Sequence, residues 1–380
     1  MSPLAALRDI ESLPAVPSPV VTGFDGFVDE MISIVAERTS LDSFSSVPDI
    51  ATFGGLVSAA AGHSSLREIV VNAVHPGGCA VNLGDGLAAL GVPVDCYATL
   101  GEPVHPAFAE PASRFRKAVS WGREPGRTLA FEFADGKLMF SSVKQLAEFT
   151  AEDIAGRLDD GAYLASCREA AIVALTDWTL YPHMTSVWRL LHREIYSQLT
   201  HHPHFFIDLV DPSSRSAEDI LAMLDSLPLF EQCGPVTLGL NGNEANILAR
   251  LLGLELSQDE PSCMRLAGEL AGKIAISSVV IHKLKFAASH AAGSSYCVAG
   301  PFCEKPLKST GAGDRFNAGF CLGLLAKAGP AECLTLGCAT SGLFVRTGTS
   351  ANREEVADFL RECSRGEILM DGVERFMGIK

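Results

Sequence analysis

The 380-residue sequence predicts an α/β protein, with a mostly parallel sheet covered by helices on both faces and a small β-rich lid. Two observations predict this class. In the second half of the chain, short β-rich runs alternate with longer segments whose apolar residues follow helical spacing. In the first half, residues 30–75 and 127–140 break that alternation. Strands and helices that alternate imply right-handed crossovers, and these place helices on both faces of a parallel sheet.

The elements of the core follow in chain order from these patterns. The predicted strands are short apolar runs: Val20–Gly23, Val92–Leu100, Ala170–Trp178, Phe205–Asp211, Val236–Leu240 and Ser277–Lys283. The predicted helices carry apolar residues on one face: Ala80–Leu90, Met184–Leu199, a helix that begins near Ser216, Asn243–Leu254, Gly313–Ala328, Ala331–Thr347 and Arg353–Cys363.

The lid is predicted from the two stretches that do not fit. Glu68–His75 looks like a strand, and Arg127–Phe140 alternates around a turn at Ala134-Asp135-Gly136 as a hairpin does. We therefore expect a core made of residues 15–29, 76–126 and 141–380. The lid is expected to contain residues 30–75 and 127–140.

Composition excludes several classes of protein. Hydrophobic residues make up 47% of the chain, which is enough for a large core. A net charge of −15 argues against nucleic acid or an anionic membrane as a partner. No apolar run approaches the length of a membrane span, and the first residues lack the pattern of a signal peptide. The 11 cysteines include no C-x-x-C pair, so we expect reduced thiols and a cytoplasmic protein.

The segment Ser309–Phe320 carries the clearest chemistry. Its glycines allow a tight turn that approaches a ligand, and the following helix points its free N–H groups into that turn. Such a turn can stabilise negative charge on a phosphoryl group in transfer. Asp314, at the same place, can accept a proton from an attacking hydroxyl. The alternative is a structural turn in which Asp314 only caps the helix.

This segment resembles the second signature of ribokinase-like (PfkB) carbohydrate kinases, D-T-x-G-A-G-D followed by F-x-A-G-F. The chain keeps the G-A-G-D and F-x-A-G-F parts and has Lys308-Ser309 in place of Asp-Thr. The resemblance implies a three-layer α/β/α core and a β lid over a sugar. It also implies that Asp314 is the catalytic base and that the amides of Gly311, Ala312 and Gly313 form the anion hole.

A second segment is similar to the first signature of that family, G-G-x-x-x-N with A-x-L-G downstream. Here it is Gly77-Gly78 followed by Asn82, with Cys79 where the family often has Lys. The resemblance implies that Gly78 and Asn82 bind the sugar, and an amide both donates to and accepts from hydroxyls. The structural alternative is an ordinary turn between a strand and a helix.

Two further elements match the family in order along the chain. Family members have a substrate-binding Asp just after the first strand, and both Asp25 and Asp29 qualify, with Asp29 favoured. Asn241 and Glu244 fit the N-x-x-E element, which the family uses for phosphate and indirectly for magnesium. The same pair is also a good capping box, so it can serve the helix alone.

The nucleotide site departs from the family. The T-x-G-x-x-G element is replaced by residues 282–288. The stretch from Lys283 to Arg315 is basic in an otherwise acidic chain, and Lys283, Lys308 and Arg315 are the predicted phosphate contacts. A scatter of solvated lysines is the alternative.

The resemblance implies an ATP-dependent kinase that transfers the γ-phosphoryl group to a hydroxyl of a sugar or sugar-like molecule. ATP and Mg²⁺ are the expected cofactors, and the family also allows a monovalent cation and a homodimer through the lid. The alternatives are a nucleoside kinase or an ADP-dependent sugar kinase of the same fold. The third alternative is a catalytically weak, kinase-like regulatory protein that binds sugar or nucleotide.

Overall fold

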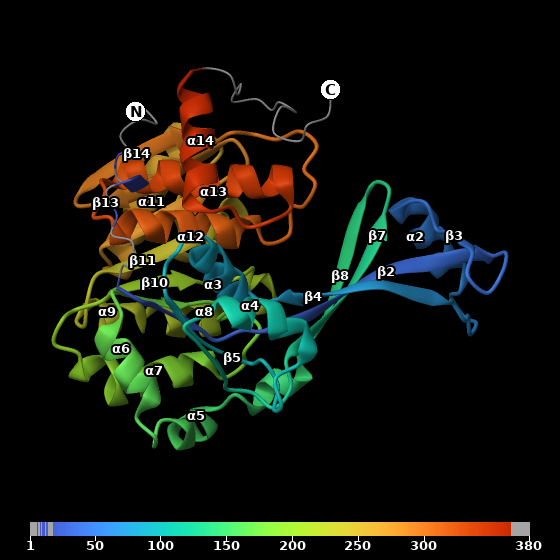
Figure 1. The fold of residues 1–380 in the computed structure, drawn as a ribbon, viewed down its shortest axis with the longest axis horizontal. Helices are drawn as coiled ribbons and strands as arrows, with labels where there is room; N and C mark the ends of the chain where they lie inside the picture. The colour runs from blue at the N-terminus through green and yellow to red at the C-terminus, as the bar shows by residue number, and fades with distance from the viewer. Residues whose placement is uncertain (1–5, 7, 9, 12, 14–17, 366–380) are drawn as a thin grey trace.

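The core of the computed structural model is a nine-stranded sheet in the order β14-β13-β12-β11-β10-β9-β1-β5-β6 (Figure 1). The structure describes residues 6, 8, 10, 11, 13 and 18–365, so residues 15–17 and 366–380 of the predicted core lie outside it. The strands of this sheet are β1 (Val20–Gly23), β5 (Val94–Ala98), β6 (Lys117–Ser120), β9 (Ile172–Leu175), β10 (His204–Asp208), β11 (Val236–Asn241), β12 (Ser278–His282), β13 (Phe286–Ala291) and β14 (Ser294–Ala299).

In this sheet, β12, β11, β10, β9, β1, β5 and β6 run parallel, and β13 and β14 form an antiparallel hairpin at one edge. Every residue of β1, β5 and β9 is buried. Strands buried on both faces appear in a sequence as largely apolar runs, and the sequence predicted these three, although β5 contains Asp95 and β1 contains Thr22. The predicted α/β class with a mostly parallel sheet is confirmed.

Helices cover both faces of the sheet and give it two hydrophobic cores. One core packs α5 (Ala151–Arg157), α6 (Ala162–Glu169), α7 (Met184–Glu194), α8 (Ala217–Leu224), α9 (Leu227–Glu231), α10 (Gly242–Leu252) and α11 (Glu260–Ile274). The other packs α3 (Cys79–Ala89), α12 (Ala312–Leu325), α13 (Pro330–Thr347) and α14 (Arg353–Ser364), with α4 (Ala109–Arg114) beside α3. Short 3₁₀ turns lie at Pro106–Phe108, Lys144–Glu148, Tyr196–Gln198 and Pro212–Ser214.

The lid is a second, five-stranded sheet that projects from the core as an arm (Figure 1). Both stretches that broke the alternation contribute to it. It contains β2 (Phe27–Arg38), β3 (Phe44–Ser46), β4 (Ile69–Gly77), β7 (Gly126–Phe133) and β8 (Gly136–Ser142), and α2 (Ile50–Ala59) lies against its outer end. The pairing is mixed, because β2 runs parallel to β7 and antiparallel to β3 and β4.

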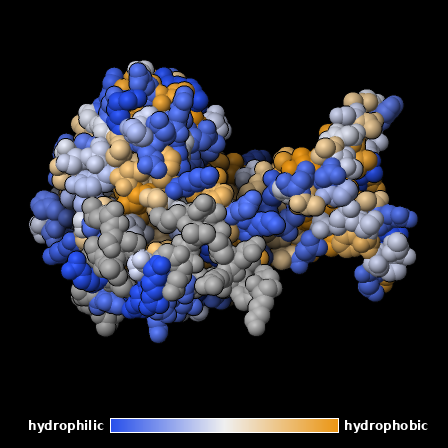
Figure 2. Space-filling view, turned by 90° about the horizontal axis from the view of Figure 1, so that it is seen from above, coloured by the Kyte–Doolittle hydropathy of each residue, from blue (hydrophilic) through white to orange (hydrophobic). Residues whose placement is uncertain are grey.

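The two faces of the lid differ. Asp29, Met31 and Ala130 share one face, because residues of a strand alternate between faces and the register pairs Asp29 with Thr128. Val74 and Phe140 lie on the opposite face. Apolar residues are visible on the arm in Figure 2.

Within the described residues, no helix is both long and apolar enough to cross a membrane.

Candidate functional site

Buried carboxylates gather where the parallel strands of the core end. Carboxyl ends of parallel strands meet at one edge of a sheet, which is where open α/β folds bind ligands. The group comprises Asp25 after β1, Asp177 after β9, Asp208 at the end of β10, Glu244 in α10 and Asp314 in α12, all 9% exposed or less. Each of them has a raised pKa, because burial disfavours the charged form.

The Gly-Ala-Gly turn forms the start of α12. Gly311 has a φ of 86°, in the left-handed region that favours glycine, and is the N-cap of the helix. A Cβ added there would lie 2.9 Å from the Arg315 guanidinium, so a side chain would also have to displace that group. The amides of Ala312 and Gly313 belong to the first turn of α12, where N–H groups have no partner within the helix, and the Ala312 amide donates to the Ser309 carbonyl oxygen at 3.1 Å. The turn can therefore stabilise an anion.

Asp314 is the third residue of α12 and makes no capping hydrogen bond. The structure thus gives it no capping role, which was the structural alternative. Burial raises its pKa to about 7, nearby Asp208 and Asp25 add to the rise, and the Arg315 charge opposes it. The Cys79 thiol hydrogen-bonds to its carboxylate. A carboxylate with a pKa near neutrality can accept a proton from a hydroxyl.

Asp25 holds the start of α3. Its carboxylate accepts hydrogen bonds from the amide of Cys79 and, at 2.8 Å, from the amide of Ala80, and a third at 2.6 Å from the Thr176 hydroxyl. Gly78 has a φ of 97°, and a Cβ added there would lie 2.7 Å from the Asp25 carbonyl oxygen. These three protein donors hold the start of α3 and the Gly77-Gly78 turn against the end of β1.

Asp29 lies in the lid rather than in a loop after the first strand. It is part of β2, and its carboxylate hydrogen-bonds to Thr128. Burial raises its pKa, although the charges of Lys137, Lys308 and His75 favour the ionised form. A Cβ added at Gly77 would collide with the Asp29 carboxylate, which therefore lies directly over the Gly77-Gly78 turn.

Asn82 connects this turn to the start of α12. It lies in the first turn of α3 and is only partly buried. A Cβ added at Gly311 would lie 3.6 Å from its side-chain nitrogen. The structure thus brings together three predicted groups: Asn82, the Gly77-Gly78 turn below Asp29, and the Gly-Ala-Gly turn with Asp314.

Asn241 and Glu244 form a complete capping box at the start of α10. The Asn241 side chain accepts from the amide of Glu244 at 3.0 Å, and the Glu244 carboxylate accepts from the amide of Asn241 at 2.8 Å. Burial, followed by the charge of Asp208, raises the pKa of Glu244 to about 8. Among the described residues, no group of three acidic, His or Cys side chains is arranged to hold a metal ion directly.

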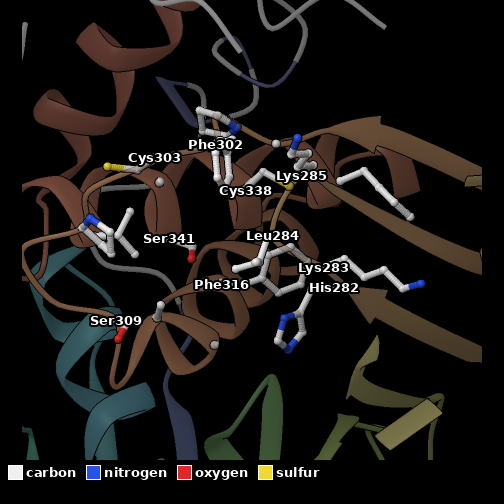
Figure 3. Close-up of a pocket in the computed structure, with 18 of the residues that line it drawn as sticks. His282, Lys283, Leu284, Lys285, Phe302, Cys303, Ser309, Phe316, Cys338 and Ser341 are labelled. Carbon is white, nitrogen blue, oxygen red and sulfur yellow. The ribbon is translucent and has the colours of Figure 1, made fainter. Parts of the chain in front are cut away.

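A cavity of about 690 Å³ lies beside the start of α12. Gly313 and Phe316 of α12, the turn from His282 to Phe286, and Phe302 and Cys338 contribute to its walls. Figure 3 shows His282 beside Phe316, with Phe302 and Cys338 on the opposite side. The rings of His282 and Phe316 are 5.1 Å apart between centroids. The segment that replaces the T-x-G-x-x-G element is therefore the wall of a ligand-sized cavity.

The predicted phosphate contacts separate in the structure. Lys283 lines the cavity, whereas Lys308 and Arg315 are not among the lining residues. Lys308 lies toward the lid, where its charge interacts with Asp29 and Asp85. The Arg315 guanidinium donates to Asp85 at 2.7 Å and to the Ser350 hydroxyl at 3.0 Å.

Sequence reasoning missed four residues of this region: Asp177, Asp208, His282 and the thiol of Cys79. Asp177 and Asp208 lie inside the predicted strands Ala170–Trp178 and Phe205–Asp211, near their C-terminal ends, and an acidic residue in that position was a usable signal. No local pattern identifies Cys79 or His282, because their neighbours come from other parts of the chain.

Three comparisons relate the chain to known proteins. A profile of the family described as prokaryotic ketohexokinase matches residues 4–363. A ketohexokinase from Haloferax volcanii is 29% identical over 343 residues, which cover 90% of each chain. The fold is similar to that of ribokinase from Arabidopsis thaliana, with a TM-score of 0.62, 18% identity and coverage of 91% of this chain and 99% of that one. A nucleoside kinase from Methanocaldococcus jannaschii gives a TM-score of 0.58, 14% identity and coverage of 92% and 99%.

Proposed function

Because the chain belongs to the prokaryotic ketohexokinase family of ribokinase-like sugar kinases, we propose that it phosphorylates a ketohexose with ATP, using Asp314 as the general base. One observation carries the assignment of the base. Asp314 is buried at the glycine turn that begins α12, beside Asn82, and its pKa of about 7 suits proton transfer at neutral pH.

The reaction needs one proton transfer and one phosphoryl transfer. The acceptor hydroxyl gives its proton to the Asp314 carboxylate as its oxygen forms a bond to the γ-phosphorus. The bond from that phosphorus to the β,γ-bridging oxygen breaks, and ADP leaves with the electron pair. The amides of Gly311, Ala312 and Gly313 are the proposed anion hole for the transferring group, because they lie at the positive end of a helix. The Ala312 amide also donates to the Ser309 carbonyl oxygen at 3.1 Å, within the same turn.

Asp29 and Asn82 are the proposed acceptor contacts. Both are only partly buried and lie next to the Gly77-Gly78 turn, whereas the Asp25 carboxylate is already satisfied by protein donors. Asp29→Ala and Asn82→Ala should therefore raise the KM for the sugar and leave nucleotide affinity nearly unchanged. Equal loss of nucleotide affinity in both variants would show that these residues serve the other half of the site.

The nucleotide is proposed to occupy the cavity beside α12. Its volume and its apolar walls suit a base and ribose, and its Lys283 suits a phosphate. The residues present fit a Mg²⁺ ion that would be held mainly by the nucleotide phosphates. Glu244 would act on it through water, because its carboxylate already accepts hydrogen bonds from Asn241. When bound, Mg²⁺ neutralises phosphate charge. Lys308 and Arg315 are proposed to support the Gly-Ala-Gly turn from outside the cavity. Lys308 interacts with Asp85 and with Asp29 of the lid, and Arg315 forms an ion pair with Asp85.

The decisive experiment measures nucleotide consumption with ATP or ADP as the donor. The acceptors are ketohexoses, aldohexoses, pentoses and nucleosides. We expect turnover with ATP and a ketohexose. Turnover with ADP, or faster turnover of a nucleoside, would favour the corresponding alternative of the same fold. Binding of sugar and ATP with no turnover by any pair would favour a regulatory protein.

We also propose a homodimer formed through the lid. The face opposite Asp29 exposes Val71, Val74 and Phe140, which are 44%, 47% and 53% exposed. Exposed apolar residues gathered on one sheet face mark an interaction surface. Sedimentation should detect a dimer that the double variant Val74→Asp, Phe140→Asp converts to monomers. Leu221→Asp, at an exposed leucine of α8 in the core, is the matched control and should stay dimeric.

A further inference from the structure

A second cavity, of about 680 Å³, lies at the opposite edge of the core sheet from the carboxylates. It is found where β10, β11 and β12 begin, between the C-terminal parts of α11 and α12. Its volume is close to that of the cavity proposed for the nucleotide, and both fall in the range of small-molecule sites. Nothing in the proposed kinase reaction uses it.

The sheet contributes polar side chains to this cavity. His204, Thr237 and Ser278 come from three neighbouring parallel strands, and the register pairs Thr237 with Ser278. They share the face of Phe206 and Val280, which elsewhere packs against α12 and α13 as apolar core. A row of polar residues on the inner face of a sheet requires partners.

Those partners are only partly supplied by the protein. The His204 ring donates or accepts one hydrogen bond at 2.7 Å with the Thr237 hydroxyl. In the described part of the chain, the Ser289 hydroxyl is buried without a hydrogen-bond partner, and Ser289 is only 1% exposed. Ser278 and Ser289 are both lining residues. Burying an unpaired hydroxyl is unfavourable, so the site is suited to a ligand that brings its own donors and acceptors.

Apart from His290 and Ser277, the remaining lining residues are apolar or glycine. Phe320 and Leu324 of α12 form one side, and glycine and alanine residues of α11 leave space on the other. No lysine, arginine or acidic residue lines the cavity. His204 stays neutral, because burial lowers its pKa to about 4. A phosphorylated or otherwise charged ligand would find no counter-charge here.

We propose that this cavity is a second binding site for a neutral, polyhydroxylated small molecule of monosaccharide size. Hydroxyl groups of the ligand bind His204, Ser278 and Ser289, and the C–H face of its ring lies against Phe320. Free ketohexose is the probe, because the proposed function makes it the sugar that the protein meets.

The blocking variant is Gly272→Phe. Gly272 is an exposed residue of α11 that lines the cavity, and a Cβ added there meets no atom within 4 Å. The ring can therefore enter the mouth of the cavity without displacing the core. Gly156→Phe is the matched control, since Gly156 is an exposed glycine of α5 with equally open space. Ser278→Ala removes a hydroxyl that lines the cavity and adds no bulk.

The test is equilibrium dialysis of each variant against radiolabelled D-fructose without nucleotide. The wild-type protein and Gly156→Phe should bind two sugars per chain, Gly272→Phe should bind one, and Ser278→Ala should bind the second several-fold more weakly. Repeating the series with Asp29→Ala separates this site from the acceptor site. Gly272→Phe should remove one sugar in either background, even if Asp29 proves not to hold the acceptor.

Three results would overturn the proposal. Wild-type protein could bind a single sugar that Asp29→Ala abolishes, which would leave only water in the second cavity. Gly272→Phe and Ser278→Ala could both bind as the wild type does. Uncharged adenosine could displace the sugar bound in the second cavity, which is the one that Gly272→Phe removes. That result would assign the cavity to a nucleoside instead.

Discussion

Burial sets the chemistry of Asp314. An exposed aspartate is a poor base at neutral pH because its pKa is near 4. Burial at the start of α12 raises the pKa of Asp314 to about 7, so the carboxylate can accept a proton and still be ionised in a large fraction of molecules. The same side chain makes no capping hydrogen bond, so its removal should not unfold the helix.

Replacing Asp314 with asparagine tests the base directly. Asp314→Asn keeps the size of the side chain and removes the basic oxygen, so kcat should fall by about 10²–10⁴. The KM values for sugar and ATP should change little, because the lost interaction belongs to the transition state. Steady-state kinetics, with circular dichroism as the check on folding, measure both. Near wild-type turnover would refute the base assignment.

The dependence of kcat/KM on pH tests Asp314 together with its neighbour Cys79. Only ionised Asp314 can accept the proton, so kcat/KM should rise as the pH increases through about 7. The Cys79 thiol is a neutral donor, since burial and the nearby carboxylates raise its pKa, and its bond to Asp314 favours the ionised carboxylate. Cys79→Ala should therefore move the rise to higher pH, and Cys79→Ser should restore it. An unchanged profile in Cys79→Ala would contradict this contact.

Local motifs predicted the residues whose role depends on their immediate neighbours. Gly311 and Asp314 were identified because a turn and the helix after it are continuous in sequence. Asp29 required more: the sequence placed it at the end of the core segment 15–29, whereas it lies in β2 of the lid and reaches the site only through pairing with β4 and β7. Long-range pairing of this kind leaves no local signal.

At the scale of elements, an ion-pair network joins the helices that carry the site. Asp85 of α3 accepts from Arg315 of α12 at 2.7 Å, from Ser350 at 2.6 Å, and from Arg114 of α4. The Asp85 and Arg315 side chains are 11% and 7% exposed. The network fixes the orientation of α12 relative to α3, and thus the position of Asp314 relative to Asn82.

Asp85→Ala should accordingly be strongly destabilising. It leaves the buried Arg315 charge without its partner, which typically costs about 3–5 kcal/mol. Urea denaturation followed by circular dichroism measures the free energy of unfolding. The control is Glu255→Ala, which breaks an exposed ion pair with Arg265 and should change that free energy little. Similar small effects in both variants would show that the network does not hold the helices.

The predicted elements were those with strong periodicity, but periodicity alone was not enough: α11 was missed although its buried Cys263, Leu266 and Leu270 follow helical spacing. Other missed elements have mixed composition. All six predicted core strands and the predicted helices are present, with ends that differ by a few residues. The hairpin β13–β14 was not predicted, because its alanine, serine and glycine residues have weak strand preference. Its pairing with β12 decides its structure. Acidic residues similarly concealed the twelve-residue strand β2.

For the molecule as a whole, its buried carboxylates predict an unusual dependence of stability on pH. The pKa values of Asp314 and Glu244 are raised to about 7 and about 8, so the folded protein retains protons that the unfolded chain loses near pH 4. The pKa values of His204 and His282 are lowered to about 4, which opposes this effect only below about pH 6.5. Above that pH, the folded state binds more protons than the unfolded state.

The free energy of unfolding should therefore fall as the pH rises from about 6.5 to 8, by about 1 kcal/mol per pH unit. Urea denaturation across this range measures the slope. Glu244→Gln removes one of the two retained protons and should flatten it, most clearly between pH 7 and 8. A stability that increases with pH over this interval would contradict the raised pKa values.

The order of strands in the core sheet has a consequence for synthesis on the ribosome. β1 is made first, yet it lies in the middle of the sheet between β5 and β9. Its second neighbour ends at Leu175, about 150 residues later, which takes about 8–30 s at roughly 5–20 residues per second. During that time the nascent chain carries a strand destined for full burial with an open edge, a template for pairing with other chains. The first half of the protein is thus a natural client for chaperones that hold unfinished chains until β9 emerges.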